Sequence, residues 1–136
     1  MLLNVLNQNC REDVMDLAIY VAMANDVLEA TEEESLNQYY QELGIEPRGT
    51  QTRCELDACI ENIVKSTSLR ERKMIMLEMV ALAYVDNVCD EKEQELLDKI
   101  CNRFEISESM MEELVGCVAK LRNVYLEIAN VIGKDE

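Results

Sequence analysis

The sequence predicts an all-α protein, and three features of the 136-residue chain support this prediction. Only four glycines and one proline are present, so few positions interrupt helices. Apolar residues make up 49% of the chain and recur at intervals of three and four residues. At five places Ser, Thr, Asp or Asn precedes a Glu by three residues, the capping-box spacing that marks helix starts. We expect residues 1–136 to form a single helical domain.

The first half of the chain is expected to contain three helices. The first begins with a capping box at Asn9 and runs to about residue 24, with apolar side chains at helical spacing. The second begins with a box at Thr31, and Gly44 is placed to end it in the left-handed conformation. A loop containing the one proline follows, and the third helix is expected over 52–65.

The second half is also expected to contain three helices. The fourth begins at Ser68 and is apolar on most sides from Met74 to Val85, which is typical of a helix at the centre of a bundle. The fifth spans about 90–104. The sixth begins at Ser109, or one turn earlier at Ser107, and continues to about residue 132.

An internal repeat relates the two halves. With a shift of 61 residues, 22–45 aligns without a gap on 83–106. Chance similarity between two amphipathic segments is the alternative, but the alignment continues through the connecting loops, which argues against it. We therefore expect pseudo-repeats at about 10–66 and 68–132. Each would be a three-helix unit, and the two would pack as a six- to seven-helix bundle around two central antiparallel helices.

The charge of the chain limits its partners. Twenty-eight acidic and 13 basic side chains give a net charge of -15. Nucleic acids and anionic membranes are excluded because their phosphates need a cationic surface. Cations and an unidentified protein partner with a basic surface are favoured. The sequence predicts no membrane insertion because no apolar run is long enough, and with no signal peptide we expect a cytoplasmic protein.

The residue types argue against an enzyme. The chain has no histidine, so it cannot build a Ser-His-Asp or Cys-His site. A hydrolytic site would have to use carboxylates and a metal alone. The six cysteines are expected to be buried thiols rather than disulfides or zinc ligands. Adjacent Tyr39 and Tyr40 must point in different directions, so at least one should be exposed, and we expect weak homo-oligomers.

The repeated helix–turn–helix carries the candidate site. In the second copy, Asp86 ends one helix, Asp90 caps the next, and Glu93 lies one turn inside it. A sharp reversal of the chain would bring these carboxylates together, and oxygen ligands suit calcium or magnesium. We call this segment and its equivalent in the first copy the acidic corners. The first-copy positions are Asn25, Glu29 and Glu32.

Helix capping offers another explanation for these residues. Asp90 and Glu93 form a capping box and favour a helix N-terminus without any metal. Asp86 is less well explained, because a carboxylate at a helix C-terminus opposes the helix dipole. The segment is not an EF-hand, since Leu97 stands where the bidentate Glu would be and Glu91 replaces the required glycine.

At these residues the chain resembles a known family. The pattern Ala-Asp-Gly-x-hydrophobic-Asp-x-x-Glu, present twice in a duplicated helical domain, is similar to the TerB domain of tellurite resistance proteins. That domain also occurs in some membrane-anchored DnaJ-type co-chaperones. The resemblance covers about 10–130. Neither copy keeps the glycine, which is replaced by Asp26 and Asn87, Asn25 replaces an aspartate, and Cys89 takes the hydrophobic position.

The resemblance implies a compact helical bundle with an acidic surface and no established catalytic activity. It also implies a role in binding divalent metal or in assembling stress-response complexes. Two functional hypotheses follow. The chain is either a non-enzymatic divalent-metal-binding or protein-interaction module linked to a tellurite-type stress response, or a purely structural acidic domain that binds a basic protein without metal.

Overall fold

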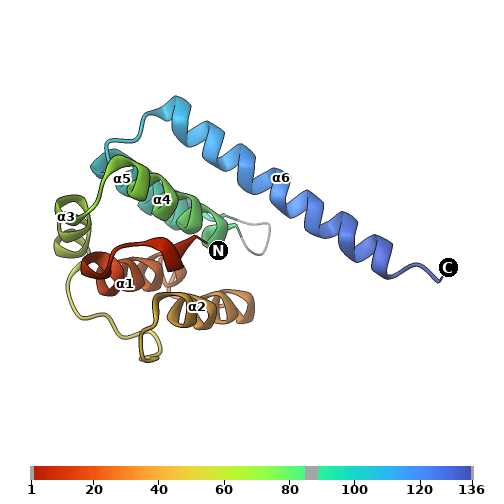
Figure 1. Ribbon diagram of the computed structural model, residues 1–136, viewed down its shortest axis with the longest axis horizontal. Helices are drawn as coiled ribbons and strands as arrows, with labels where there is room; N and C mark the ends of the chain where they lie inside the picture. The colour runs from red at the N-terminus through yellow and green to blue at the C-terminus, as the bar shows by residue number, and fades with distance from the viewer. Residues whose placement is uncertain (1, 85–88, 136) are drawn as a thin grey trace.

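The computed structural model describes residues 2–84 and 89–135, and within these ranges it contains helices and no strands. The predicted all-α bundle is confirmed (Figure 1). Two short 3-10 helices precede six α-helices. Their bounds are Leu3–Val5 (η1), Gln8–Cys10 (η2), Arg11–Ala22 (α1), Ala30–Leu43 (α2), Leu56–Ser66 (α3), Leu69–Ala83 (α4), Glu91–Arg103 (α5) and Glu108–Ile132 (α6).

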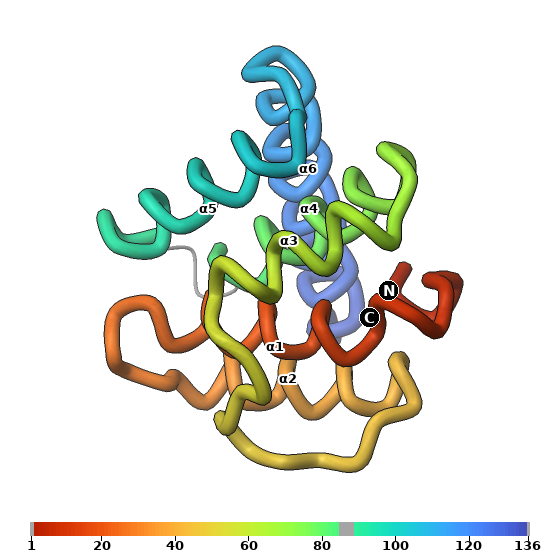
Figure 2. The backbone as a smooth tube through the Cα atoms, turned by 90° about the vertical axis from the view of Figure 1, so that its left-hand side faces the viewer, coloured from red at the N-terminus to blue at the C-terminus, as the bar shows by residue number. Residues whose placement is uncertain are grey.

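Helices α1 and α4 form the centre of the bundle. They pack against each other, α1 also contacts α2 and α3, and α4 also contacts α5 and α6. Figure 2 shows α2 below α1, with α5 and α6 on the other side of the pair. Most side chains of α1 and α4 are buried, as expected for helices that are apolar on several sides.

All three predicted helix starts in the first half are wrong, because other contacts hold the backbone there. Helix α1 begins at Arg11, and its N-cap residue is Cys10, which makes no side-chain cap hydrogen bond. Asn7 instead caps the preceding η2, where its side chain accepts a hydrogen bond from the Asn9 amide at 2.9 Å. Helix α2 is capped by a Glu29–Glu32 box, not by Thr31. The expected third helix over 52–65 starts later, at Leu56, because the preceding residues contact α1 instead.

The second half agrees more closely with the expected helix starts. Ser68 and Glu71 form the predicted capping box of α4, and Asp90 caps α5. Helix α6 is capped by Ser107, the earlier of the two candidate positions. Helix α4 ends at Ala83 with Tyr84 as its C-cap, before Asp86, which the sequence places at the helix end and which lies outside the described residues.

The described helices follow the 61-residue shift seen in the sequence. Helices α2 and α5 begin at positions 30 and 91, and α1 and α4 end at positions 22 and 83. Gly44 ends α2 with a φ of 67°, and Glu105, its counterpart, has a φ of 60°. A non-glycine residue in the left-handed region is uncommon, so this shared turn is a specific backbone correspondence. The assignment of residues 1–136 to one domain stays a prediction.

The side chains proposed for self-association do not support it. Tyr39 and Tyr40 are both buried, with hydroxyls that donate to the carbonyls of Glu78 and Gly49, so the expectation that one is exposed is wrong. All six cysteines are free, but only Cys10, Cys59 and Cys101 are buried. Among the described residues, no helix combines the length and apolar character needed to cross a membrane.

Candidate functional site

The second acidic corner is built around the start of α5. Asp90 has extended backbone angles, and its Oδ1 accepts a hydrogen bond of 2.8 Å from the backbone amide of Glu93. This bond satisfies one of the amides that a helix N-terminus leaves without an internal partner. Asp86, the remaining predicted ligand of this corner, lies outside the described residues.

The first acidic corner has a related construction. Glu29 caps α2, and the Oε1 atom of Glu32 accepts a hydrogen bond of 3.1 Å from the backbone amide of Glu29. Ahead of the helix, Asn25 Oδ1 accepts a hydrogen bond of 3.1 Å from the amide of Val27. Asp26, between them, has a φ of 62°. Because a short polar side chain tolerates the left-handed region, this sequence can reverse tightly without glycine.

The structure brings the two acidic corners together. The side chain of Asn25, from the first copy, lies near Asp90 of the second copy and helps to lower the pKa of its carboxyl. Figure 2 shows the α1–α2 connection and the start of α5 along the same edge of the molecule. The sequence predicts a site in each copy but does not reveal that the copies meet.

Asp90 is held in its charged form. The backbone hydrogen bond from Glu93 lowers its pKa most, and hydrogen bonds from Asn25 and the backbone of Lys92, with the Lys92 charge, lower it further. Partial desolvation raises the pKa of Asp90, but this effect is smaller than the combined lowering, so the net shift is downward. A carboxylate has about four lone-pair positions, so capping α5 leaves Asp90 able to accept further electropositive partners.

The other glutamates of the acidic corners differ in exposure. Glu32 and Glu93, which correspond under the repeat, are only 3% and 4% exposed. Glu29 is exposed, and Asn25 and Asp90 are half-buried. Oxygen atoms at both the surface and the interior therefore line this edge. Asn25, Glu29, Glu32, Asp90 and Glu93 supply only oxygen donors suited to hard cations.

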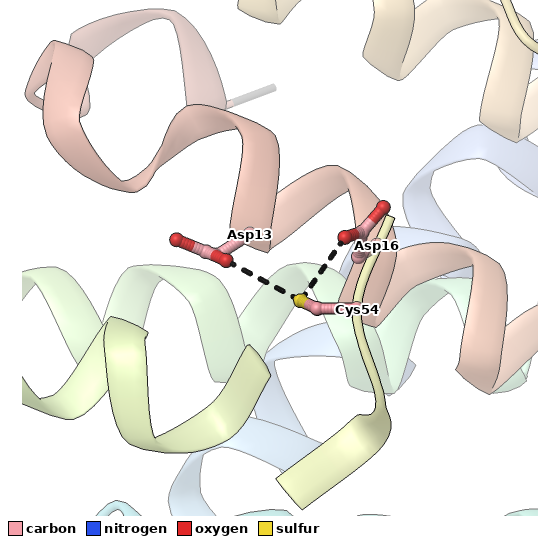
Figure 3. Close-up of side chains that lie close together, drawn as sticks. All are labelled: Asp13, Asp16 and Cys54. Carbon is pink, nitrogen blue, oxygen red and sulfur yellow. Dashed lines mark hydrogen bonds between the residues drawn. The ribbon is translucent and has the colours of Figure 1, made fainter. Parts of the chain in front are cut away.

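A second group of acidic residues lies on α1, where sequence analysis did not identify it. Asp13, Asp16 and Cys54 each place one ligand-type atom within 4.8 Å of the others (Figure 3). Asp16 is fully buried on α1, and Cys54 comes from the segment before α3. An aspartate among the apolar residues of α1 was the available signal, because a buried carboxylate requires partners.

Two arginines already supply those partners. The Arg48 guanidinium donates to Asp16 and, at 3.0 Å, to Glu12. Arg53 donates its backbone amide to Asp16 Oδ2 at 3.2 Å, and its guanidinium lies 3.7 Å from Asp13. We call Asp13, Asp16, Arg48, Arg53 and Cys54 the arginine cluster. It fastens the segment before α3 onto α1.

Cys54 in the arginine cluster does not have the character of a metal ligand. Burial raises the pKa of its thiol, and the hydrogen bond and negative charge of Asp16 raise it further. The thiol therefore stays protonated, with Sγ 3.5 Å from Asp16 Oδ2 and 3.8 Å from Asp13 Oδ1. Metals bind the thiolate, and a cation here would also meet two guanidinium groups. The acidic corners are thus the better candidate site.

Comparisons with known proteins agree with the second half of this fold. The family model described as tellurite resistance protein TerB matches residues 50–115. These residues include α3, α4, α5 and the start of α6, and with them the second acidic corner. The first acidic corner precedes the matched region. No curated protein and no solved structure matches the chain.

Proposed function

Because residues 50–115 match the TerB family model, we propose that this chain is a TerB-like, non-enzymatic binding module whose adjoining acidic corners bind one hard divalent cation, calcium or magnesium. The proposed ligands are Asp86, Asp90 and Glu93 from one copy with Asn25, Glu29 and Glu32 from the other.

The closeness of Asn25 to Asp90 carries this proposal, because the Asn25 side chain lies near enough to help lower the pKa of the Asp90 carboxyl. A predicted ligand residue of the first copy thus lies beside one of the second, so a cation placed there would draw on both halves of the chain. The first copy has an amide where the second has Asp86, and an amide oxygen is an ordinary calcium ligand. A neutral ligand at this position reduces the repulsion between neighbouring carboxylates.

Electrostatics also supports cation binding. The chain carries a net charge of -15, which raises the local concentration of cations around it. At the acidic corners, the described partners of Asp90 and Glu29 are mainly amide N–H groups, which orient a carboxylate but leave its full negative charge in place. A divalent ion would compensate that charge and link α2 to α5.

The matching family model extends the proposal to biological role. Since it is the model of a tellurite resistance protein, we propose that the module acts in a tellurite-type stress response, in the cytoplasm, by coupling cation binding to a protein partner. No catalytic step is assigned, because the sequence lacks histidine and the carboxylates described here serve as helix caps.

A second candidate function is an acidic interaction domain that binds a basic protein and no metal. It is favoured by the double capping box of α2 and the Asp90 cap of α5, since helix capping alone gives these carboxylates a structural role. The two functions differ in one measurable property, the response of stability to divalent cations.

Thermal unfolding of the whole chain tests the proposal. The chain is unfolded in EDTA and then in calcium, magnesium or manganese, at constant ionic strength. A cation that binds only the folded state at a hundredfold excess over its Kd adds about 2.7 kcal/mol to the free energy of unfolding. We expect this rise for the wild-type chain and not for Asp90→Asn, which keeps a good N-cap side chain but loses the charge.

Glu55→Gln provides the matched control. Glu55 is an exposed N-cap of α3 without a side-chain cap hydrogen bond, so its replacement removes one charge from a helix start outside the acidic corners. This variant should respond to cations like the wild-type chain. If wild type shows no cation-dependent rise, the metal proposal is wrong and the basic-partner function is favoured. Equal responses of Asp90→Asn and Glu55→Gln would indicate non-specific screening.

A further inference from the structure

The C-terminal half of α6 extends away from the rest of the bundle (Figure 1). The helix has 25 residues, and Val118 is its one fully buried side chain. Beyond Val118, large apolar side chains are exposed to between 47% and 77%. These are Val124, Tyr125, Leu126, Ile128, Val131 and Ile132. An isolated helical segment of this length has only marginal stability in water, and an exposed apolar surface of this kind is typical of a protein-protein contact.

The apolar residues of α6 follow a heptad repeat. Intervals of three and four alternate through three heptads without a break. The seam comprises Met111, Leu114, Val118, Leu121, Tyr125, Ile128 and Ile132. Its first part packs against the core through Met111, Leu114 and Val118. The same seam then continues into solvent, where it has the pattern of a helix that pairs with another helix.

A groove separates this seam from the body of the protein. It has a volume of about 540 Å³, with Tyr39, Glu78 and Ala81 on the body side. Leu121, Arg122 and Tyr125 line it on the α6 side. The lining of the groove is mainly apolar, and it includes the polar side chains of Ser35, Gln38, Glu78 and Arg122. It is large enough for a few side chains from the end of a second helix.

From this groove and seam, we propose that the chain forms a homodimer in which the exposed halves of two α6 helices pair antiparallel. In this arrangement Tyr125 meets the partner's Ile128. Leu121 meets the partner's Ile132, which enters the groove beside α4.

Charge favours a second copy in this orientation. Residues 119–135 carry three basic and two acidic side chains, so the projecting segment is close to neutral while the whole chain carries -15. Antiparallel pairing places the two acidic bodies at opposite ends of the helix pair, which reduces their repulsion. It also brings Arg122 near the negative C-terminal end of the partner helix and the partner's Asp135.

The flanks of the seam and the available area support the same arrangement. Val124 and Val131 lie along one side of the seam, and antiparallel pairing lays these apolar flanks on each other. The six exposed apolar side chains of two copies together present on the order of 1,000 Å², which reaches the size of a small specific interface.

Sedimentation velocity in EDTA tests the dimer independently of any metal site. We expect the wild-type chain to sediment as a dimer. Ile128→Glu should raise the dimer Kd at least about a hundredfold, because each dimer loses two buried isoleucines and gains two charges. Asn123→Glu adds the same charge on the opposite side of α6 and should leave the dimer intact. Equal thermal midpoints of dilute Ile128→Glu and Asn123→Glu chains would show that both fold.

A monomeric wild-type chain at all concentrations would overturn the proposal, and so would equal dissociation of the two variants. Orientation has its own readout in Cys117, which is exposed. In the antiparallel pair the two Cys117 thiols lie at opposite ends of the helix pair, so mild oxidation should not link them. Any disulfide-linked dimer that does form should therefore be equally abundant in the Cys117→Ser variant. Formation of a disulfide between the two Cys117 thiols would show a parallel pair and overturn the proposed orientation.

Discussion

The arginine cluster and the acidic corners differ in the groups that contact their carboxylates. In the arginine cluster, guanidinium groups of Arg48 and Arg53 lie against Asp16 and Asp13, so positive and negative charges balance within the protein. At the acidic corners, backbone amides at the helix starts orient Asp90 and Glu29, and the Asn25 side chain lies near Asp90. Amide dipoles orient a carboxylate without cancelling its charge.

This difference separates a structural cluster from a candidate binding site. Asp13, Asp16 and Cys54 bring three ligand-type atoms within 4.8 Å of one another, yet two guanidinium groups already pair with these aspartates and the thiol is protonated. Under the proposed function, the cation therefore binds where carboxylates keep their negative charge and not where ligand atoms merely lie close together. Four predictions test this comparison.

The largest effect is expected at the arginine cluster. Arg48→Ala removes the guanidinium that pairs with fully buried Asp16 and should lower the free energy of unfolding by about 3 kcal/mol. Urea unfolding measures the loss. Arg70→Ala, at an exposed position of α4, should change stability by less than about 0.5 kcal/mol. A small effect of Arg48→Ala would mean that Arg53 alone neutralises Asp16.

The second prediction locates the cation. Cys54→Ser removes the thiol of the arginine cluster and should leave the calcium-dependent rise in thermal midpoint unchanged, whereas Glu29→Gln at the acidic corners should reduce it. The reason is that a hard cation prefers carboxylates that retain their charge. Parallel melting curves with and without calcium make the comparison. If Cys54→Ser loses the response and Glu29→Gln keeps it, the cation binds in the arginine cluster.

Much of the fold was predictable because its signals are local. The apolar surface of the fourth helix identified α4 as central, the repeat placed a second central helix beside it, and the Ser68–Glu71 box set the start of α4. Gly44 adopts the left-handed angle expected at the end of α2. Errors arose where several residues compete to cap one helix, as Glu29 and Thr31 do at α2, because the choice depends on where the chain enters the helix.

Less of the candidate site was predictable, because its main contacts join distant segments. The repeat identified equivalent residues in the two copies, but the approach of Asn25 to Asp90 depends on how the halves pack. The arginine cluster likewise links α1 to Arg48 and Arg53 through a loop without a motif. The prediction that Tyr39 or Tyr40 is exposed was wrong for the same reason, since both hydroxyls donate to carbonyl groups of distant residues inside the fold.

The third prediction separates helix capping from cation binding. Ser68→Ala removes the α4 cap, which lies outside the acidic corners, and should cost about 1 kcal/mol with or without calcium. Asp90→Ala should cost more with calcium than in EDTA, because it removes both a cap and a proposed ligand. Chemical unfolding under both conditions gives the two differences. Equal costs of Asp90→Ala in calcium and EDTA would leave capping as its only role.

The smallest effect is a change in acid sensitivity. The pKa of Asp90 is lowered in the folded chain, chiefly by the Glu93 backbone amide, so folding favours its charged form. Its contribution to stability is therefore present above the pKa of the unfolded chain and is lost as the pH falls through the lower folded value. In EDTA, wild-type stability should decrease more steeply than that of Asp90→Asn over this acidic range, because asparagine caps the helix without titrating. Unfolding curves across the range measure the two slopes. Identical slopes would mean that the capping bond does not distinguish the two protonation states of Asp90, and the contrast with the arginine cluster would then rest on cation binding alone.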